Sequence, residues 1–347
     1  MISPIINIAI SALLLSGCSS KNITTNETKP GTVSPPPVTV QSVRVIGVAT
    51  ATELKNALSA AKPGDSIVLK DGIYSGKFVI SNNGTGEQPV FVTGSKNAIL
   101  DAGSTATGYV LQIKGSYNIV KGITIQNGLK GIMADAVTNV IIDGVTVTNT
   151  GEEGIHLRSF SSNNTIQNCT ITHTGKKTPD YGEGIYIGSA KNNWEKYSDG
   201  KPDNSDNNKV LNNSIGPFVA AECIDIKEGT TGGLIKGNRF NSEGITGANG
   251  GDSWIDVKGN NYVIEENTGY NPQDNAAFID GYQVNCAYPG WGNNNVFRNN
   301  KSEVNASGYA INVRLKSSQG EVTGTVVYAG NTAVGAAKGI TNITITP

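Results

Sequence analysis

A short pattern of alternating apolar residues recurs along this chain, and it is the feature that most restricts the fold. The pattern opens a strand, continues through a second short strand and an Asn or Gly corner, and ends in a third strand. Its opening apolar residues are Leu111, Ile132, Ile155, Ile185, Ile224, Ile255, Ile279 and Ile311. The smallest spacing is 21 residues, from Leu111 to Ile132, and the larger spacings indicate loops inserted into a constant unit.

Three short strands in about 21 residues predict one rung of an all-β, right-handed parallel β-helix. Each strand pairs with its copies in the neighbouring rungs, about 4.8 Å away. Val, Ile and Leu fill the interior, while Asn and Gly take the corners, where left-handed backbone angles are tolerated. Residues 50–74 predict a short helix, a turn and a strand, and such a helix can cap the core. The alternative folds are a β-sandwich or a propeller, which would show hairpin turns and four-strand units.

The N-terminal residues predict export and a tether ahead of this domain. Residues 1–17 contain an apolar run too short to span a bilayer, as in a signal peptide. The run ends in Leu-Ser-Gly-Cys, which resembles a bacterial lipobox and implies lipidation of Cys18. Residues 18–43 are rich in Pro, Ser and Thr and read as a flexible tether, followed by the β-helix domain at 44–347. We expect a cell-envelope protein, either an outer-membrane lipoprotein or a secreted protein.

Composition restricts the partners. Lys and Arg number 27 and Asp and Glu 28, so a net charge of −1 provides no global field for nucleic acid. An anionic ligand must therefore be bound by a local group of cationic side chains. Cys169, Cys223 and Cys286 allow at most one disulfide, and we expect Cys169 to be a buried free thiol. We expect a monomer whose only membrane contact is the lipid anchor.

The outward side chains of the opening strands should form columns, because successive residues of a strand point to opposite faces. The first column is Gln112, Met133, His156, Tyr186, Asp225, Asp256, Asp280 and Asn312. The second is Lys114, Asp135, Arg158, Gly188, Lys227, Lys258, Tyr282 and Arg314. Charges and aromatic residues gather in the central rungs beside the longest insertions, which predicts a walled groove for an extended acidic polysaccharide. A solvated array of surface charges is the simpler alternative.

Several aromatic and cationic residues near this groove are the predicted substrate contacts. They are His156, Arg158, Tyr186, Arg239, Trp254, Trp291 and Arg314. The arginines among them can hold carboxylates through two parallel hydrogen bonds.

Two stretches, residues 51–94 and 222–240, resemble secreted polysaccharide lyases of the chondroitinase B and alginate lyase type. The second stretch reads ECIDIKEGTTGGLIKGNRF. In that family a Glu binds calcium and a Lys five residues later is the catalytic base, and Glu222 and Lys227 have this spacing. Lys258 stands in place of the family's catalytic Arg, and Ala220 in place of a second calcium carboxylate. The resemblance implies elimination from a uronate polysaccharide, with calcium as the cofactor.

Elimination from a uronate requires neutralisation of the carboxylate, a base and a proton donor. Lys227 is the predicted base, because a neighbouring ammonium group at Lys258 lowers the pKa of a lysine. Lys258 or Tyr282 is the predicted proton donor. The residues predicted to bind calcium, or else to orient the lysines, are Glu222, Asp225 and Asp256. The alternative functions are hydrolysis or epimerisation in the same groove, and non-catalytic glycan binding at the cell surface.

Overall fold

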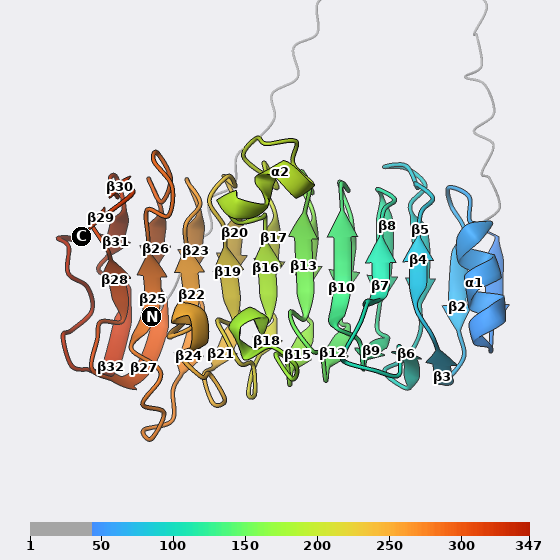
Figure 1. The fold of residues 1–347 in the computed structure, drawn as a ribbon, viewed down its shortest axis with the longest axis horizontal. Coiled ribbons are helices and arrows are strands. Elements are labelled where there is room, and N and C mark those ends of the chain that lie inside the picture. The colour runs from blue at the N-terminus through green and yellow to red at the C-terminus, as the bar shows by residue number, and fades with distance from the viewer. Residues whose placement is uncertain (1–43) are drawn as a thin grey trace, which may run out of the picture. The chain divides into compact units, whose positions relative to one another are not determined.

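The computed structural model describes residues 44–347, and it confirms the parallel β-helix (Figure 1). Its rungs stack in a row, and a complete rung contributes one strand to each of three parallel sheets. The predicted signal peptide, the lipidation of Cys18 and the tether at 18–43 lie outside the described residues and stay predictions. Within residues 44–347, neither helix is long and apolar enough to cross a membrane.

The three sheets contain 12, 9 and 10 strands and are called sheets 1, 2 and 3 here. Sheet 1 contains β1 (Val45–Val48), β2 (Ser66–Leu69), β5 (Val90–Thr93), β8 (Asn118–Lys121), β11 (Ile141–Asp143), β14 (Thr165–Gln167), β17 (Lys209–Leu211), β20 (Leu234–Lys236), β23 (Val263–Glu265), β26 (Val296–Arg298), β31 (Val326–Tyr328) and β33 (Ile345–Thr346). Sheet 2 contains β4 (Phe78–Ile80), β7 (Tyr109–Ile113), β10 (Lys130–Asp135), β13 (Ile155–Arg158), β16 (Ile185–Ile187), β19 (Ile224–Ile226), β22 (Ser253–Val257), β25 (Asp280–Val284) and β28 (Ile311–Val313). Sheet 3 contains β3 (Gly72–Ser75), β6 (Ala98–Asp101), β9 (Thr124–Gln126), β12 (Thr146–Thr148), β15 (Thr170–Thr172), β18 (Ser214–Ile215), β21 (Arg239–Asn241), β24 (Thr268–Tyr270), β27 (Lys301–Ala306) and β32 (Thr332–Ala336). A small hairpin of β29 (Lys316–Ser317) and β30 (Gly320–Glu321) completes the strands.

A short helix covers the N-terminal end of the core, as the sequence predicts. Helix α1 (Ala51–Ser59) begins with a capping box, in which the Thr50 side chain accepts from the Glu53 N–H and the Glu53 carboxylate accepts from the Thr50 N–H. The apolar face of α1 buries Leu54 and Leu58 against the first rungs. The cap therefore shields the open end of the apolar interior from water.

Buried asparagines fix the rungs against one another at the corner between sheets 1 and 3. The Asn238 side chain donates to the Val210 carbonyl and to the side-chain oxygen of Asn267. The same pattern repeats along the stack. Its members are Asn213, Asn238, Asn267, Asn300 and Asn331. Because every amide is buried and bonded, a slip of one rung would leave several polar groups unpaired.

The inward-facing residues of sheet 2 are the predicted ones up to the rung of β22, and they differ from the prediction at the rung of β25. Ile224 pairs with Ile255, but Ile255 pairs with Tyr282 and not with Ile279, which is 41% exposed. Tyr282 is fully buried, so its prediction as an outward proton donor is wrong. The reason is steric: Gly281 lies where the Trp254 ring fills the corner, and a Cβ there would come within 2.8 Å of that ring.

The same packing corrects the prediction for Trp254. Its side chain is fully buried and contacts Phe278 and Tyr282, with ring centroids 4.9 and 5.7 Å away. Trp254 is thus a core residue and cannot contact a substrate in the groove. All three cysteines of the described chain are buried and unpaired, which confirms Cys169 as a buried thiol and leaves Cys223 and Cys286 without a disulfide.

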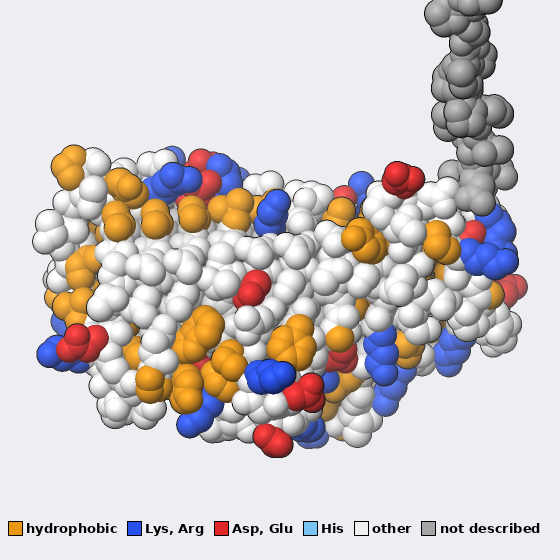
Figure 2. Space-filling view, turned by 90° about the horizontal axis from the view of Figure 1, so that it is seen from above, with side chains coloured by type: hydrophobic (Ala, Val, Ile, Leu, Met, Phe, Trp, Pro, Cys, Tyr) orange, Lys and Arg blue, Asp and Glu red, His pale blue; other side chains and the backbone are white. Residues whose placement is uncertain are grey.

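On the face seen in Figure 2, charged side chains form small groups of mixed sign within a mostly neutral surface. This distribution agrees with the near-balanced composition. Recognition of a charged ligand therefore depends on a local arrangement of side chains.

Trp254→Ala should lower the free energy of unfolding by about 3–5 kcal/mol, because it empties a packed aromatic corner. Chemical denaturation of the purified domain measures this loss. If the variant kept wild-type stability and instead bound substrate more weakly, the assignment of Trp254 to the core would be wrong.

Candidate active site

A cleft of about 310 Å³ lies on the outward face of sheet 2. Its lining comes from rungs between β16 and β28 and from one inserted loop. The lining residues are Glu183, Glu222, Asp225, Lys227, Asn249, Gly250, Asp256, Lys258, Gln283, Asn285 and Arg314. Four carboxylates and three cationic side chains thus meet in a concave surface with no large apolar group.

Strand register builds the cleft floor from two columns. Asp225 pairs with Asp256, and Asp256 pairs with Gln283 rather than with the predicted Asp280. The members of the second column are also stacked, because each one comes directly after a residue that is paired with its counterpart on the next rung. It consists of Lys227, Lys258, Asn285 and Arg314. The predicted stacking of the two Asp–Lys pairs is therefore confirmed, while the third aspartate and Tyr282 are replaced by neutral amides.

Asp225 links the two lysines. Its Oδ2 lies 2.5 Å from Lys227 Nζ, and its Oδ1 accepts from Lys258 Nζ at 2.8 Å on the adjacent rung. Lys258 Nζ is also 2.6 Å from Asp256 Oδ2, and Asp256 Oδ1 accepts from the Asn285 amide at 2.5 Å. This diagonal pairing offsets the repulsion between stacked like charges.

The carboxylates keep both lysines charged. Burial opposes the charged form of Lys227, but Asp225, Glu183 and Glu222 outweigh it and raise the pKa of Lys227 above its ordinary value. Burial likewise opposes the charged form of Lys258, and Asp225 and Asp256 raise its pKa. The expectation that Lys258 lowers the pKa of Lys227 is wrong for this state, because Asp225 lies between the two ammonium groups.

A third outward column precedes the opening strands, and Glu222 is the member of it for which the sequence predicted a role. It contains Glu153, Glu183 and Glu222, each two residues before the opening Ile of its rung. The backbone confirms this register: the Gly154 N–H donates to the Glu183 carbonyl, and the Gly184 N–H donates to the Glu222 carbonyl. The signal was available as the repeated Glu-Gly-Ile at 153–155 and 183–185 and the Glu-Cys-Ile at 222–224.

Three of the cleft's acidic groups lie close enough together to share a cation. Oxygen atoms of Glu183, Glu222 and Asp225 lie within 4.8 Å of one another, and all three residues are buried. Glu183 Oε2 has no hydrogen-bond partner within residues 44–347. Burial, together with the neighbouring carboxylates, raises the pKa of Glu183 and raises that of Glu222 to about 8. This excess of buried oxygen donors fits calcium chemistry, with Glu183 in the place predicted for Asp256.

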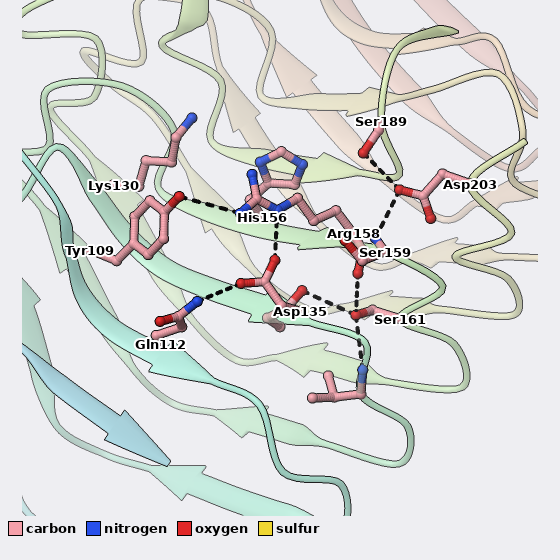
Figure 3. Close-up of polar contacts among 12 residues, drawn as sticks. Tyr109, Gln112, Lys130, Asp135, His156, Arg158, Ser159, Ser161, Ser189 and Asp203 are labelled. Carbon is pink, nitrogen blue, oxygen red and sulfur yellow. Dashed lines mark hydrogen bonds and ion pairs between the residues drawn. The ribbon is translucent and has the colours of Figure 1, made fainter. Parts of the chain in front are cut away.

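A second polar network surrounds Arg158 on the rungs of β7, β10 and β13, which precede the cleft in the stack (Figure 3). Arg158 Nε donates to Asp135 Oδ1 at 2.6 Å, and its Nη2 donates to the Tyr109 hydroxyl at 3.3 Å. Gln112 donates to the other oxygen of Asp135 at 2.6 Å. The Tyr197 ring centroid lies 3.9 Å from the guanidinium carbon of Arg158. The charge of Arg158 is thus neutralised inside this network.

His156 on β13 and Tyr186 on β16 are neighbours in the first column, on the side of the cleft that faces the Arg158 network. Their rings lie 4.4 Å apart, and the Lys227 ammonium lies 4.9 Å from the Tyr186 ring centroid. His156 Nε2 is 2.9 Å from the Gly188 carbonyl, and its Nδ1 is 3.2 Å from Glu153 Oε1. Neither side chain lines the cleft, but Tyr186 contacts Lys227, which does.

Comparison with known proteins agrees with this architecture. The profile described as "Pel9A-like, right handed beta helix region" matches residues 44–181. The crystal structure of an alginate lyase from Paenibacillus sp. str. FPU-7 is 40% identical, with a TM-score of 0.79, over 86% of this chain and 97% of that one. The chain belongs to the right-handed β-helix polysaccharide lyases.

Two more distant structures share the fold with this lyase. Pectate lyase Pel9A is 15% identical, with a TM-score of 0.60, over 85% of this chain and 78% of that one. A mannuronic acid-specific family 6 polysaccharide lyase from human gut microbiota is 15% identical, with a TM-score of 0.55, over 84% of this chain and 75% of that one. A search of curated proteins gave no match.

Two predicted substrate contacts of the lyase lie away from the cleft. Arg239 is on β21 of sheet 3, where it pairs with Ser214 and Thr268, so it projects from a different face. Trp291 is half-buried in the loop after β25 and does not line the cleft. Of the predicted contacts, Arg314 is the one that lines the cleft within the described chain.

Inserted loops flank the strands of the lyase beside the cleft. Helix α2 (Trp194–Tyr197) belongs to the insertion after β16, and Trp194 packs edge-on against Tyr288, 5.2 Å away, from the loop after β25. Asp203 anchors this insertion to the turn after β13, because its carboxylate accepts from the Ser159 N–H at 2.9 Å (Figure 3). On the other side, Asn249 donates to the backbone carbonyl of Asp180 at 3.3 Å. Loops of different rungs therefore support one another around the site.

Glu153→Gln should destabilise the lyase in a pH-dependent way. Burial opposes ionisation of Glu153, but His156 and Lys130 outweigh it and lower its pKa from 4.5 to about 2. A carboxyl group with a lowered folded-state pKa contributes stability above its unfolded pKa, and this stability is lost as the pH falls through the folded pKa. The stability difference from the wild type should therefore be full at neutral pH and shrink below about pH 4.5.

Denaturation midpoints over a pH series measure this difference, with Glu266→Gln on the exposed surface as the control. A difference that stays constant down to the lowest pH at which the protein folds would contradict the ionised state of Glu153.

Proposed function

We propose that this lyase cleaves a uronate-containing acidic polysaccharide by β-elimination. The observation that carries the proposal is the line of Lys227, Lys258 and Arg314 along the floor of one cleft. Such a line of cations matches the carboxylates of a polyuronate chain. Alginate is the first polymer to test, because the 40% identical structure is named an alginate lyase.

The elimination assigns one proton transfer to each lysine. Uncharged Lys227 accepts the proton α to the uronate carboxylate, the electron pair forms a carbon–carbon double bond, and the bond to the 4-linked oxygen breaks. Charged Lys258 donates a proton to the departing oxygen. Its position 2.8 Å from Asp225, which also holds Lys227, keeps both groups on the same side of a bound sugar.

Calcium is proposed as the cofactor, held by Glu183, Glu222 and Asp225. These three carboxylates are the ones that raise the pKa of Lys227. A bound divalent cation would compensate them, which favours the uncharged base and attracts the uronate carboxylate. With all four of its carboxylates ionised, the cleft has a formal charge of −1, and a bound divalent cation would change it to +1.

Lys227→Ala should reduce turnover by about 10²–10⁴-fold, because it removes the proton acceptor. The assay is the ultraviolet absorbance of the unsaturated product on a panel of polyuronates, with the exposed Lys209→Ala variant on sheet 1 as the control. Near-normal turnover in a folded Lys227→Ala variant would falsify the assignment of the base. New reducing ends without absorbance would indicate hydrolysis, and retention of polymer without turnover would indicate a binding protein.

Calcium should raise the melting temperature of the chelator-treated wild type and should have little effect on Glu183→Gln. At a calcium concentration 100 times the Kd, binding stabilises the folded state by about 2.7 kcal/mol. Thermal unfolding with and without calcium measures this, and Glu243→Gln on the exposed surface is the matched control. An identical calcium response in all three proteins would exclude this site.

A further inference from the structure

Arg314 extends the column of catalytic lysines toward the C-terminal rungs. Register places Lys258, Asn285 and Arg314 on three successive rungs, because Val257 pairs with Val284 and Val284 pairs with Val313. With rungs about 4.8 Å apart, Arg314 starts about 10 Å along the stack from Lys258. It lines the same cleft.

Arg314 differs from the other cleft cations in being unpaired. Lys227 and Lys258 are both bound to aspartates. The guanidinium of Arg314 makes no ion pair or side-chain hydrogen bond within residues 44–347, and its side chain is exposed. The charge of Arg314 acts on the nearby Asp252 carboxylate, but the hydrogen bond that Asp252 accepts comes from the Gln283 amide, at 2.7 Å. Five N–H donors and a full charge therefore face the cleft without an acceptor.

The rungs of β13 and β10, which come next in the opposite direction along the sheet, do not offer such a group. Arg158 is 7% exposed and is held by Asp135 and Tyr109 under the ring of Tyr197. No residue of β13 lines the cleft, whereas the lining reaches Arg314 after β28. A chain bound at Lys227 therefore finds its next free cation toward the C-terminal rungs.

We infer that Arg314 binds the carboxylate of a second uronate, in the sugar that lies two rungs beyond Lys258. A forked guanidinium holds a carboxylate through two parallel hydrogen bonds, so this contact selects acidic sugars at a distance from the reacting bond. The inference rests on the proposed function and adds to it the direction of the bound chain and a specificity-determining residue.

Arg314→Ala should raise KM about 10- to 100-fold on long alginate oligomers with little change in kcat, because the lost contact contributes equally to ground-state and transition-state binding. Arg314→Lys should recover part of the loss. Oligomers too short to reach Arg314 should be cleaved equally by the wild type and by Arg314→Ala. Arg239→Ala, an exposed arginine on sheet 3, is the matched control and should behave as the wild type on every length.

The outcomes separate this inference from the proposed function. If the wild type cleaves the polymer and Arg314→Ala matches Arg239→Ala on all lengths, the inference is overturned while the proposed function stands. An equal loss on short and long oligomers would also overturn it, because that result places Arg314 at the reacting sugar. If the wild type cleaves no polyuronate, both the proposed function and this inference fail.

Discussion

Strict vertical register between rungs is the constraint on which the site depends. Parallel pairing in three sheets places each side chain directly over its counterpart one rung away, and a slip of one residue would turn every outward group inward. The buried asparagines make such a slip costly, because their amides bond both to a neighbouring asparagine and to backbone carbonyls. The columns of charges can therefore be positioned by the scaffold rather than by flexible loops.

Stacked like charges repel one another, and this repulsion is offset to a different extent in each column. In the Asp and Lys columns, diagonal pairs such as Lys258–Asp225 offset the repulsion. In the Glu column, Glu153 is matched by Lys130 and His156, but Glu183 retains an unpartnered oxygen. Buried polar groups are normally satisfied, so a conspicuous exception in a cleft indicates a functional constraint. The cation that we propose between Glu183, Glu222 and Asp225 would account for this exception.

The repeat was enough to predict the fold, the N-terminal cap and the stacking of the two Asp–Lys pairs, because apolar spacing determines which residues point inward. It did not determine the rung that contains Tyr282, since both Ile279 and Tyr282 fit an alternating strand. The choice between them depends on Gly281 making room for Trp254, which is a three-dimensional contact. Arg239 was placed near the groove because sequence position alone did not assign its strand to sheet 3.

The pKa values of the site's lysines could not be predicted from the sequence either. Proximity of two lysines suggested a lowered pKa, but the structure inserts Asp225 between them and adds Glu183 from another rung. Alternation predicts the direction of side chains only within a strand, whereas Glu183 lies at the corner before the opening Ile, where the backbone also turns a side chain outward. The Glu-Gly-Ile motif is repeated in the sequence, but the sequence alone does not show whether its Glu side chain points outward or inward.

The most direct test is a crystal structure of the Lys227→Ala variant with an oligouronate bound. The account predicts a chain lying along sheet 2, with one sugar beside Lys258 and the chain continuing toward β28. A chain bound on sheet 1 or sheet 3, or one running from Lys258 toward β10, would contradict it.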